Sequence, residues 1–166
     1  DIMLLPKIER IKWITFICKS FSDTNKQISE ENAERLADLM KDTPWYVQQL
    51  AHYTWTLTQK TATTKEINAA LQELIYANTP FYQKEVETIS NTQLNLLKAV
   101  AKGEIQFTST AVMQHYFLGT PRNVSKNKTI LLNNDVIHVV SGLHTFVDPA
   151  FELWFNKQYF NNPYLI

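Results

Sequence analysis

The chain has 166 residues, 45% of them hydrophobic and 12% aromatic, and sixteen basic residues balance sixteen acidic ones. This composition suits one large domain or two small ones, and the zero formal charge excludes a chain-wide attraction to nucleic acid. The single cysteine, Cys18, excludes a disulfide framework, and its apolar neighbours favour a small buried side chain in a reducing compartment. No apolar run approaches the roughly 20 residues that span a bilayer, so we expect a cytoplasmic protein without a membrane segment.

Residues 7–88 are predicted to form an all-α bundle of four or five helices. The first predicted helix has five apolar residues at helical spacing, namely Ile8, Ile11, Ile14, Ile17 and Phe21. Ser29 is expected to cap the second helix, and the pair Thr43-Pro44 to start the third, because proline loses nothing in a first helical turn. Glycine is absent before Gly103, which favours helices joined by short caps over tight turns.

The end of this bundle has two further signals. Thr63 and Glu66 have the spacing of a capping box, which predicts the start of a fourth helix. Thr79-Pro80 repeats the cap-plus-proline pattern, so we expect the chain to kink or restart there. The third predicted helix carries four large aromatics, for which core packing is favoured over a binding site: Trp45, Tyr46, Tyr53 and Trp55.

Residues 89–155 have the element order of a winged helix. Ser90 and Gln93 predict a capping box before one helix, and the run IQF at 105–107 predicts a short strand. A second helix, TAVMQHYF, and a third, starting at Thr120-Pro121, follow. Two short alternating runs around Ser141-Gly142 then predict a hairpin. Helix, strand, helix, helix, strand, turn, strand is a helix-turn-helix with a β-hairpin appended.

The predicted fold class is therefore mainly α, with a helical bundle in residues 1–88 and a winged helix-turn-helix in residues 89–155. The segment DPAFELWF is expected to cap a last helix whose aromatic residues pack back on the bundle. Residues 156–166 are expected to extend that helix or to pack on it.

The third helix of the predicted winged helix is the candidate binding element. In DNA-binding members of this architecture it enters the major groove. Four polar residues are expected to face outward on it, namely Arg122, Asn123, Lys126 and Lys128. Arginine and asparagine can read base edges, and lysine suits phosphate. The predicted wing, however, has no lysine or arginine, so a domain that contacts protein remains the alternative, and is the one favoured.

Metal and catalytic motifs are missing from the sequence. The four histidines have no paired ligand spacing, and His138 with His144 fits a cross-strand pair on the hairpin better than a metal site. Neither GxxxxGK[ST] nor GxGxxG occurs, so no phosphate-binding loop is predicted. We expect no catalytic residue, metal or cofactor in this stretch.

Five segments in the same order resemble the C-terminal part of the prokaryotic, archaeal-type P-loop ATPases of the AAA+/STAND group. They are LPKIERIKWITFICKSF, TPWYVQQLAHYTW, NTQLNLLKAVAKG, LGTPRNVSKNKTILLNNDVI and FVDPAFELWF. The resemblance implies that DIMLL leaves the last strand of an upstream ATPase domain and that the chain is a fragment. Residues 7–88 would be the helical lid, and ATP and Mg²⁺ would bind upstream in the parent protein.

The resemblance also places the start of the third helix, at Pro44, Trp45 and Tyr46, near the nucleotide of the parent. Asp42 stands where glycine is usual and no arginine follows, so sensing of the γ-phosphate is not expected here. Asn127 departs from the usual apolar residue, which would either loosen its helix or need a polar partner.

Two functional hypotheses follow from the sequence. In the first, the chain is the regulatory end of an ATPase, where nucleotide binding tilts the lid and the lid repositions a winged helix that contacts protein or DNA. In the second, it is a free-standing winged-helix regulator that binds DNA and dimerises through its helical bundle.

Overall fold

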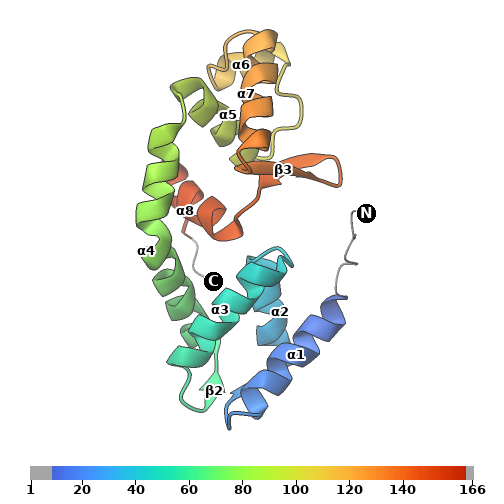
Figure 1. Cartoon of the computed structure of the whole chain (residues 1–166), viewed down its shortest axis with the longest axis vertical. Helices are drawn as coiled ribbons and strands as arrows, with labels where there is room; N and C mark the ends of the chain where they lie inside the picture. Colours follow the sequence, from blue (N-terminus) through green and yellow to red (C-terminus); the bar gives the residue numbers. More distant parts are fainter. Residues whose placement is uncertain (1–8, 164–166) are drawn as a thin grey trace. The chain divides into compact units, whose positions relative to one another are not determined.

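The computed structural model describes residues 9–163, and its elements are mainly helical. They follow in the order α1 (Arg10–Ser22), β1 (Gln27–Ile28), α2 (Glu30–Leu39), α3 (Pro44–Leu57), β2 (Thr61–Ala62), α4 (Thr64–Thr88), α5 (Asn91–Ala101), α6 (Thr110–His115), α7 (Pro121–Asn133), β3 (Ile137–Val140), β4 (Leu143–Phe146) and α8 (Pro149–Phe160) (Figure 1). The chain divides into two compact units between Tyr76 and Ala77, within α4 and upstream of the predicted boundary at residue 88. Within residues 9–163, no helix combines the length and hydropathy that crossing a membrane requires.

The first unit is a helical bundle built around α2. Its helices α1 and α3 both pack against α2 (Figure 1). Ser29 caps α2 as predicted, since its hydroxyl accepts a hydrogen bond from the Asn32 amide at 3.2 Å. A two-residue parallel pairing of β1 with β2, which the sequence did not reveal, ties together the segments that precede α2 and α4.

The first helix buries a different stripe from the one predicted. Ile14, Ile17 and Phe21 are buried as expected, but Trp13 joins them and Ile11 is 65% exposed. Ile8 and the segment DIMLL lie outside the described residues. Helix α1 begins only at Arg10, so Ile11 lies in its first turn, where its side chain faces solvent.

The aromatic residues of α3 are not its core. The buried residues of this helix are Val47, Leu50 and Thr54. Trp45 is 64% exposed, and the other three aromatics are half-buried. The prediction of core packing was therefore wrong for α3, because the buried stripe of this helix consists of smaller side chains and the rings lie outside it.

Helix α4 continues through Pro80, so the predicted restart is wrong. Proline cannot donate the bond to the carbonyl of Tyr76, four residues earlier. The side chain of Tyr76 is 83% exposed, so this part of the helix lies in water, which can satisfy the carbonyl instead.

The second unit contains the C-terminal part of α4 and the winged helix of α5, α6, α7, β3 and β4, followed by α8. This order confirms the predicted fold class. The capping box before α5 is present in full, with reciprocal bonds between Ser90 and Gln93 of 3.3 and 2.8 Å. Ser141 and Gly142 both have positive φ, of 51° and 80°, as the tight turn of a two-residue hairpin requires.

The predicted strand at 105–107 does not form. Ile105 is 66% exposed, whereas Phe107 is 5% exposed. The ring of Phe107 packs edge-on against that of His144, with centroids 5.4 Å apart. The run therefore contributes one anchoring ring to the unit rather than a third strand to the sheet.

Aromatic residues of α8 close the second unit. Phe151 stacks on Tyr82 of α4 with ring centroids 5.1 Å apart, and the ring centroids of Phe155 and Phe146 of β4 are 5.3 Å apart. The predicted cap of α8 is present, because one carboxylate oxygen of Asp148 accepts bonds from the amides of Ala150 and Phe151 at 2.8 and 3.0 Å. The last helix thus packs on α4 and the hairpin at once.

The Asp148 cap should give a pH-dependent contribution to stability. Burial raises the pKa of its carboxyl, although the two amide bonds and a bond from Tyr82 act in the opposite direction. A carboxyl whose pKa is higher folded than unfolded binds its proton more readily in the folded state, so folding gains stability as the pH falls through the folded pKa.

We therefore expect the stability of wild type relative to Asp148→Asn to rise as the pH falls from 7 to about 4, near the ordinary pKa of aspartate. Asparagine keeps the cap without the charge, whereas Asp148→Ala removes the cap as well and should be about 1 kcal/mol less stable than Asp148→Asn at either pH. Urea denaturation at both pH values measures the differences. A wild-type advantage that shrinks at acid pH would contradict this assignment.

Candidate nucleic-acid or partner interface

Helix α7 is held so that one side of it faces solvent. Its hydroxyl cap is Thr120, whose side chain accepts a bond from the Asn123 amide at 3.3 Å, and Pro121 occupies the first turn. Val124 and Leu131 are 2% and 0% exposed, as predicted. This buried stripe fixes the rotation of the helix about its own axis, and with it the residues that a partner can reach.

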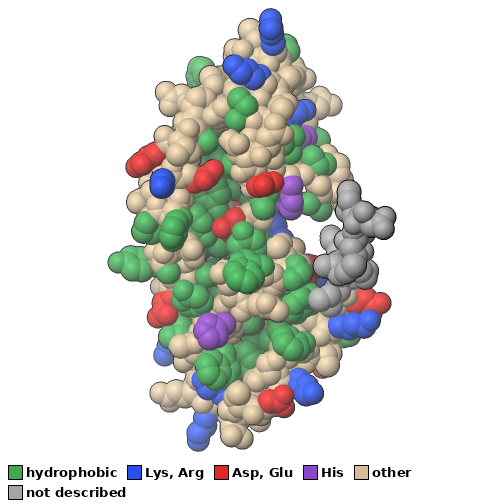
Figure 2. Space-filling model, in the orientation of Figure 1, with side chains coloured by type: hydrophobic (Ala, Val, Ile, Leu, Met, Phe, Trp, Pro, Cys, Tyr) green, Lys and Arg blue, Asp and Glu red, His purple; other side chains and the backbone are tan. Residues whose placement is uncertain are grey.

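Three of the four candidate residues share the exposed side. Arg122, Asn123 and Lys126 are exposed. Neither of the two cations forms an ion pair with another described residue, and α7 contains no acidic residue. In Figure 2 the charged side chains visible over α6 and the start of α7 are lysines or arginines. This side of α7 is therefore a small, uncompensated basic surface.

The chain enters α7 through Gly119, whose φ is +81°. A Cβ atom at this position would lie 2.9 Å from the side-chain nitrogen of Asn123. Glycine at 119 thus allows Asn123 to fold back over the turn and still remain exposed.

The fourth candidate, Lys128, lies elsewhere. It is half-buried and lines a hollow of about 420 Å³ with Phe107 and His144. Burial, and then the charge of Lys128, lower the pKa of His144. Lys128 therefore lines the hollow beside His144 and not the exposed side of α7 that carries Arg122 and Lys126.

Asn127 is part of the buried stripe, at 7% exposure. The helix runs unbroken through it from Pro121 to Asn133, so the polar residue does not disrupt α7.

The wing presents apolar side chains instead of cations. Val139, Val140 and Leu143 are 53%, 40% and 51% exposed, and residues 137–146 contain no charged side chain. We call these three residues the wing tip. His138 pairs in register with Thr145, and His144 with Val139. The two histidines are therefore not opposite each other, and the predicted cross-strand pair is wrong. A wing of this composition cannot bind phosphate by charge, but it can pack against an apolar surface.

Phe117 is a further exposed ring, which the sequence analysis missed. It lies in the turn between α6 and α7, is 78% exposed and has a φ of 55°. Glycine commonly occupies such a left-handed position after a helix. The only sequence feature that could have indicated this exposed ring is the position of Phe117 next to Leu118-Gly119, where a helix was expected to end.

The residues that the resemblance places near a nucleotide lie in the first unit, and the candidate residues of α7 in the second. Pro44 and Trp45 are exposed and Tyr46 is half-buried, all in the first turn of α3. Asp42, in the position where glycine was expected, has a φ of 53° and pairs with Arg10 at 2.6 Å. The described residues include no group of three histidine, cysteine, aspartate or glutamate side chains that could hold a metal ion.

Residues 80–157 match the model of a protein family described as a probable winged helix domain. The match covers the C-terminal part of α4, the whole helix-turn-helix with its hairpin, and most of α8. No curated protein and no solved structure matches the chain.

The left-handed backbone of Phe117 generates a prediction about stability. Left-handed geometry costs an L-residue about 1–2 kcal/mol, and an exposed ring regains little of this by packing. Phe117→Gly should therefore stabilise the protein by up to about 1 kcal/mol, read from the midpoint of urea denaturation. Phe117→Ala, which keeps the strain, is the matched control, and an equal gain in both variants would assign the effect to the ring instead.

Proposed function

We propose that the winged helix of residues 80–157 is a non-catalytic interaction module that docks on a protein through its wing tip. The observation that carries the proposal is the composition of the wing, in which three large apolar side chains are exposed and no cation is present. Exposed apolar clusters of this kind are typical of protein contacts. The charge-based phosphate contacts, which supply a large share of the affinity for DNA, come from lysine and arginine.

A second candidate function is DNA binding by α7. It is favoured by the exposed Arg122, Asn123 and Lys126, which have no acidic neighbour on their helix. Three such residues offer at most two charged phosphate contacts. The logarithm of the binding constant would then fall with that of salt with a slope of about −2, which is shallow for a DNA-binding domain.

We also propose that the parent protein is a P-loop ATPase of the AAA+/STAND group, with residues 7–88 as its lid and with ATP and Mg²⁺ bound upstream. The order of the five resembling segments supports this proposal. In the coding sequence we expect a GxxxxGK[ST] motif within a few hundred codons upstream of Asp1, because ATP binding needs that loop. A start codon next to Asp1 would contradict it and favour the free-standing regulator.

Titration of the chain into labelled duplex DNA, followed by fluorescence anisotropy at low and at moderate salt, separates the two modes of binding. We expect no binding, or weak binding that Arg122→Ala with Lys126→Ala does not change. Lys84→Ala, an exposed lysine on α4, is the matched control. Salt-sensitive binding that only the α7 variant loses would assign the module to DNA.

A photo-reactive residue in place of Val140 tests the wing directly in cells that produce the full-length protein. We expect adducts with protein from position 140 and none from position 84. Adducts with DNA from position 140 would contradict docking on protein.

A further inference from the structure

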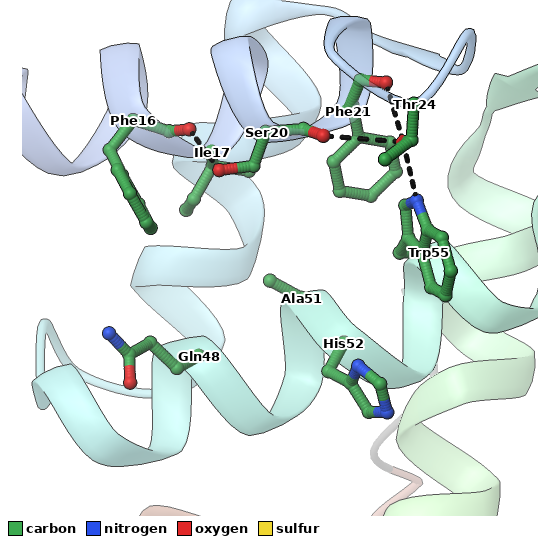
Figure 3. A pocket seen from close by; sticks show the side chains of 9 residues that line it. All are labelled: Phe16, Ile17, Ser20, Phe21, Thr24, Gln48, Ala51, His52 and Trp55. Carbon is green, nitrogen blue, oxygen red and sulfur yellow. Dashed lines mark hydrogen bonds between the residues drawn. The ribbon is translucent and has the colours of Figure 1, made fainter.

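The first unit contains a hollow of about 410 Å³ between α1 and α3 (Figure 3). Both helices pack on α2, and Ala51 offers only a methyl group where they face each other. Buried Ile17 and Phe21 line its α1 side, and Phe16 and Trp55 lie toward its two ends. The hollow is thus open because the small side chain of Ala51 faces the larger side chains of α1.

The polar atoms around the hollow bond mainly to one another. The Ser20 hydroxyl donates to the carbonyl of Phe16 at 2.8 Å. The Thr24 hydroxyl donates to the carbonyl of Phe21 at 2.9 Å and accepts from the indole N–H of Trp55 at 2.8 Å (Figure 3). These groups therefore have no need of a polar ligand, and the surface that they leave is apolar.

The aromatic wall is fixed before any ligand arrives. The rings of His52 and Trp55 stack with centroids 6.1 Å apart and planes 20° from parallel. Lys26 lies 4.1 Å over the indole ring and donates to the backbone carbonyl of Trp55 at 2.6 Å. A wall held in this way loses little conformational entropy when a ligand binds.

Charge and length define what the hollow can hold. No lysine, arginine, aspartate or glutamate lines it, and the ammonium of Lys26 is already bonded to the Trp55 carbonyl, so no lining side chain would neutralise an ionic ligand. Its α1 side extends from Phe16 to the end of the helix at Ser22 and on to Thr24, and the helical part is about 9 Å long at 1.5 Å per residue. A docked helix would need a longer strip.

We propose that this hollow is a binding site for an uncharged aromatic small molecule of about the size of a naphthalene derivative. Its volume lies in the range of about 300–1,000 Å³ that ligand pockets occupy, and its lining of rings with a few polar groups at the rim is typical of such sites. Gln48 and His52, one turn apart on the rim, can bond to a hydroxyl or amine on the ligand.

The test uses the whole chain and the neutral probe N-phenyl-1-naphthylamine, which fluoresces when it enters an apolar site. We expect saturable binding that 2-naphthol displaces about tenfold more effectively than the anion 2-naphthoate, a ratio equivalent to about 1.4 kcal/mol. Equal displacement by both would overturn the assignment to uncharged ligands. Absence of saturable probe binding would overturn the site.

Two variants locate the probe. Ala51→Phe fills the hollow and should weaken binding about tenfold or more, whereas Ala77→Phe, the same change at an exposed position of α4, should leave it unchanged. Phe16→Ala removes a ring that is 54% exposed, so folding should tolerate it, and it should weaken binding roughly two- to tenfold. Unchanged probe binding in both Ala51→Phe and Phe16→Ala would overturn the proposal. None of these residues belongs to α7 or the wing, so the result is independent of the proposed docking function.

Discussion

The buried stripe of α7 is the constraint on which the winged helix depends. Val124 and Leu131 are almost completely buried, and truncation of a leucine at such a site typically costs about 2–5 kcal/mol. An exposed ion pair contributes about 0–1 kcal/mol. Packing therefore decides how α7 lies, and the charges of Arg122 and Lys126 face solvent as a consequence of that packing.

Buried packing also holds the base of the hairpin, whereas the tip of the hairpin is exposed. Phe146 is 1% exposed and contacts both Phe151 and Phe155, so α8 holds the base of the hairpin. Four residues earlier in the chain, the left-handed turn at Ser141-Gly142 leaves the wing tip in solvent. The packed base keeps the hairpin rigid, and the apolar side chains of the wing tip are exposed. This combination suits a docking element, because binding then costs little conformational entropy.

In the first unit the central helix α2 has the corresponding role. Its buried residues are small or aliphatic, namely Ala33, Leu36 and Ala37. They allow α1 and α3 to approach α2 closely, and Ala51 leaves space between these two outer helices. The aromatic residues excluded from that contact become the wall of a hollow, so the same packing that forms the bundle also forms the candidate ligand site.

The sequence by itself determined the helical class, most helix starts and the winged-helix order. Capping residues such as Ser29, Ser90 and Asp148 act within a few residues of their own position, and the positive φ values of Ser141 and Gly142 are equally local. It also placed Arg122, Asn123 and Lys126 on the exposed side of α7, because the spacing of Val124 and Leu131 defines the opposite side.

Tertiary structure decided the features that depend on neighbours distant in the chain. A strand at 105–107 needed a partner edge, and the burial of Phe107 against His144 took its place. Lys128 turned toward that same histidine, the rings of α3 lie outside its buried stripe, and the hollow beside Trp55 arose between two helices that both pack on a third. Local sequence patterns show which secondary structure each residue prefers. Which residues become buried depends on how several elements pack together, so only the folded chain shows it.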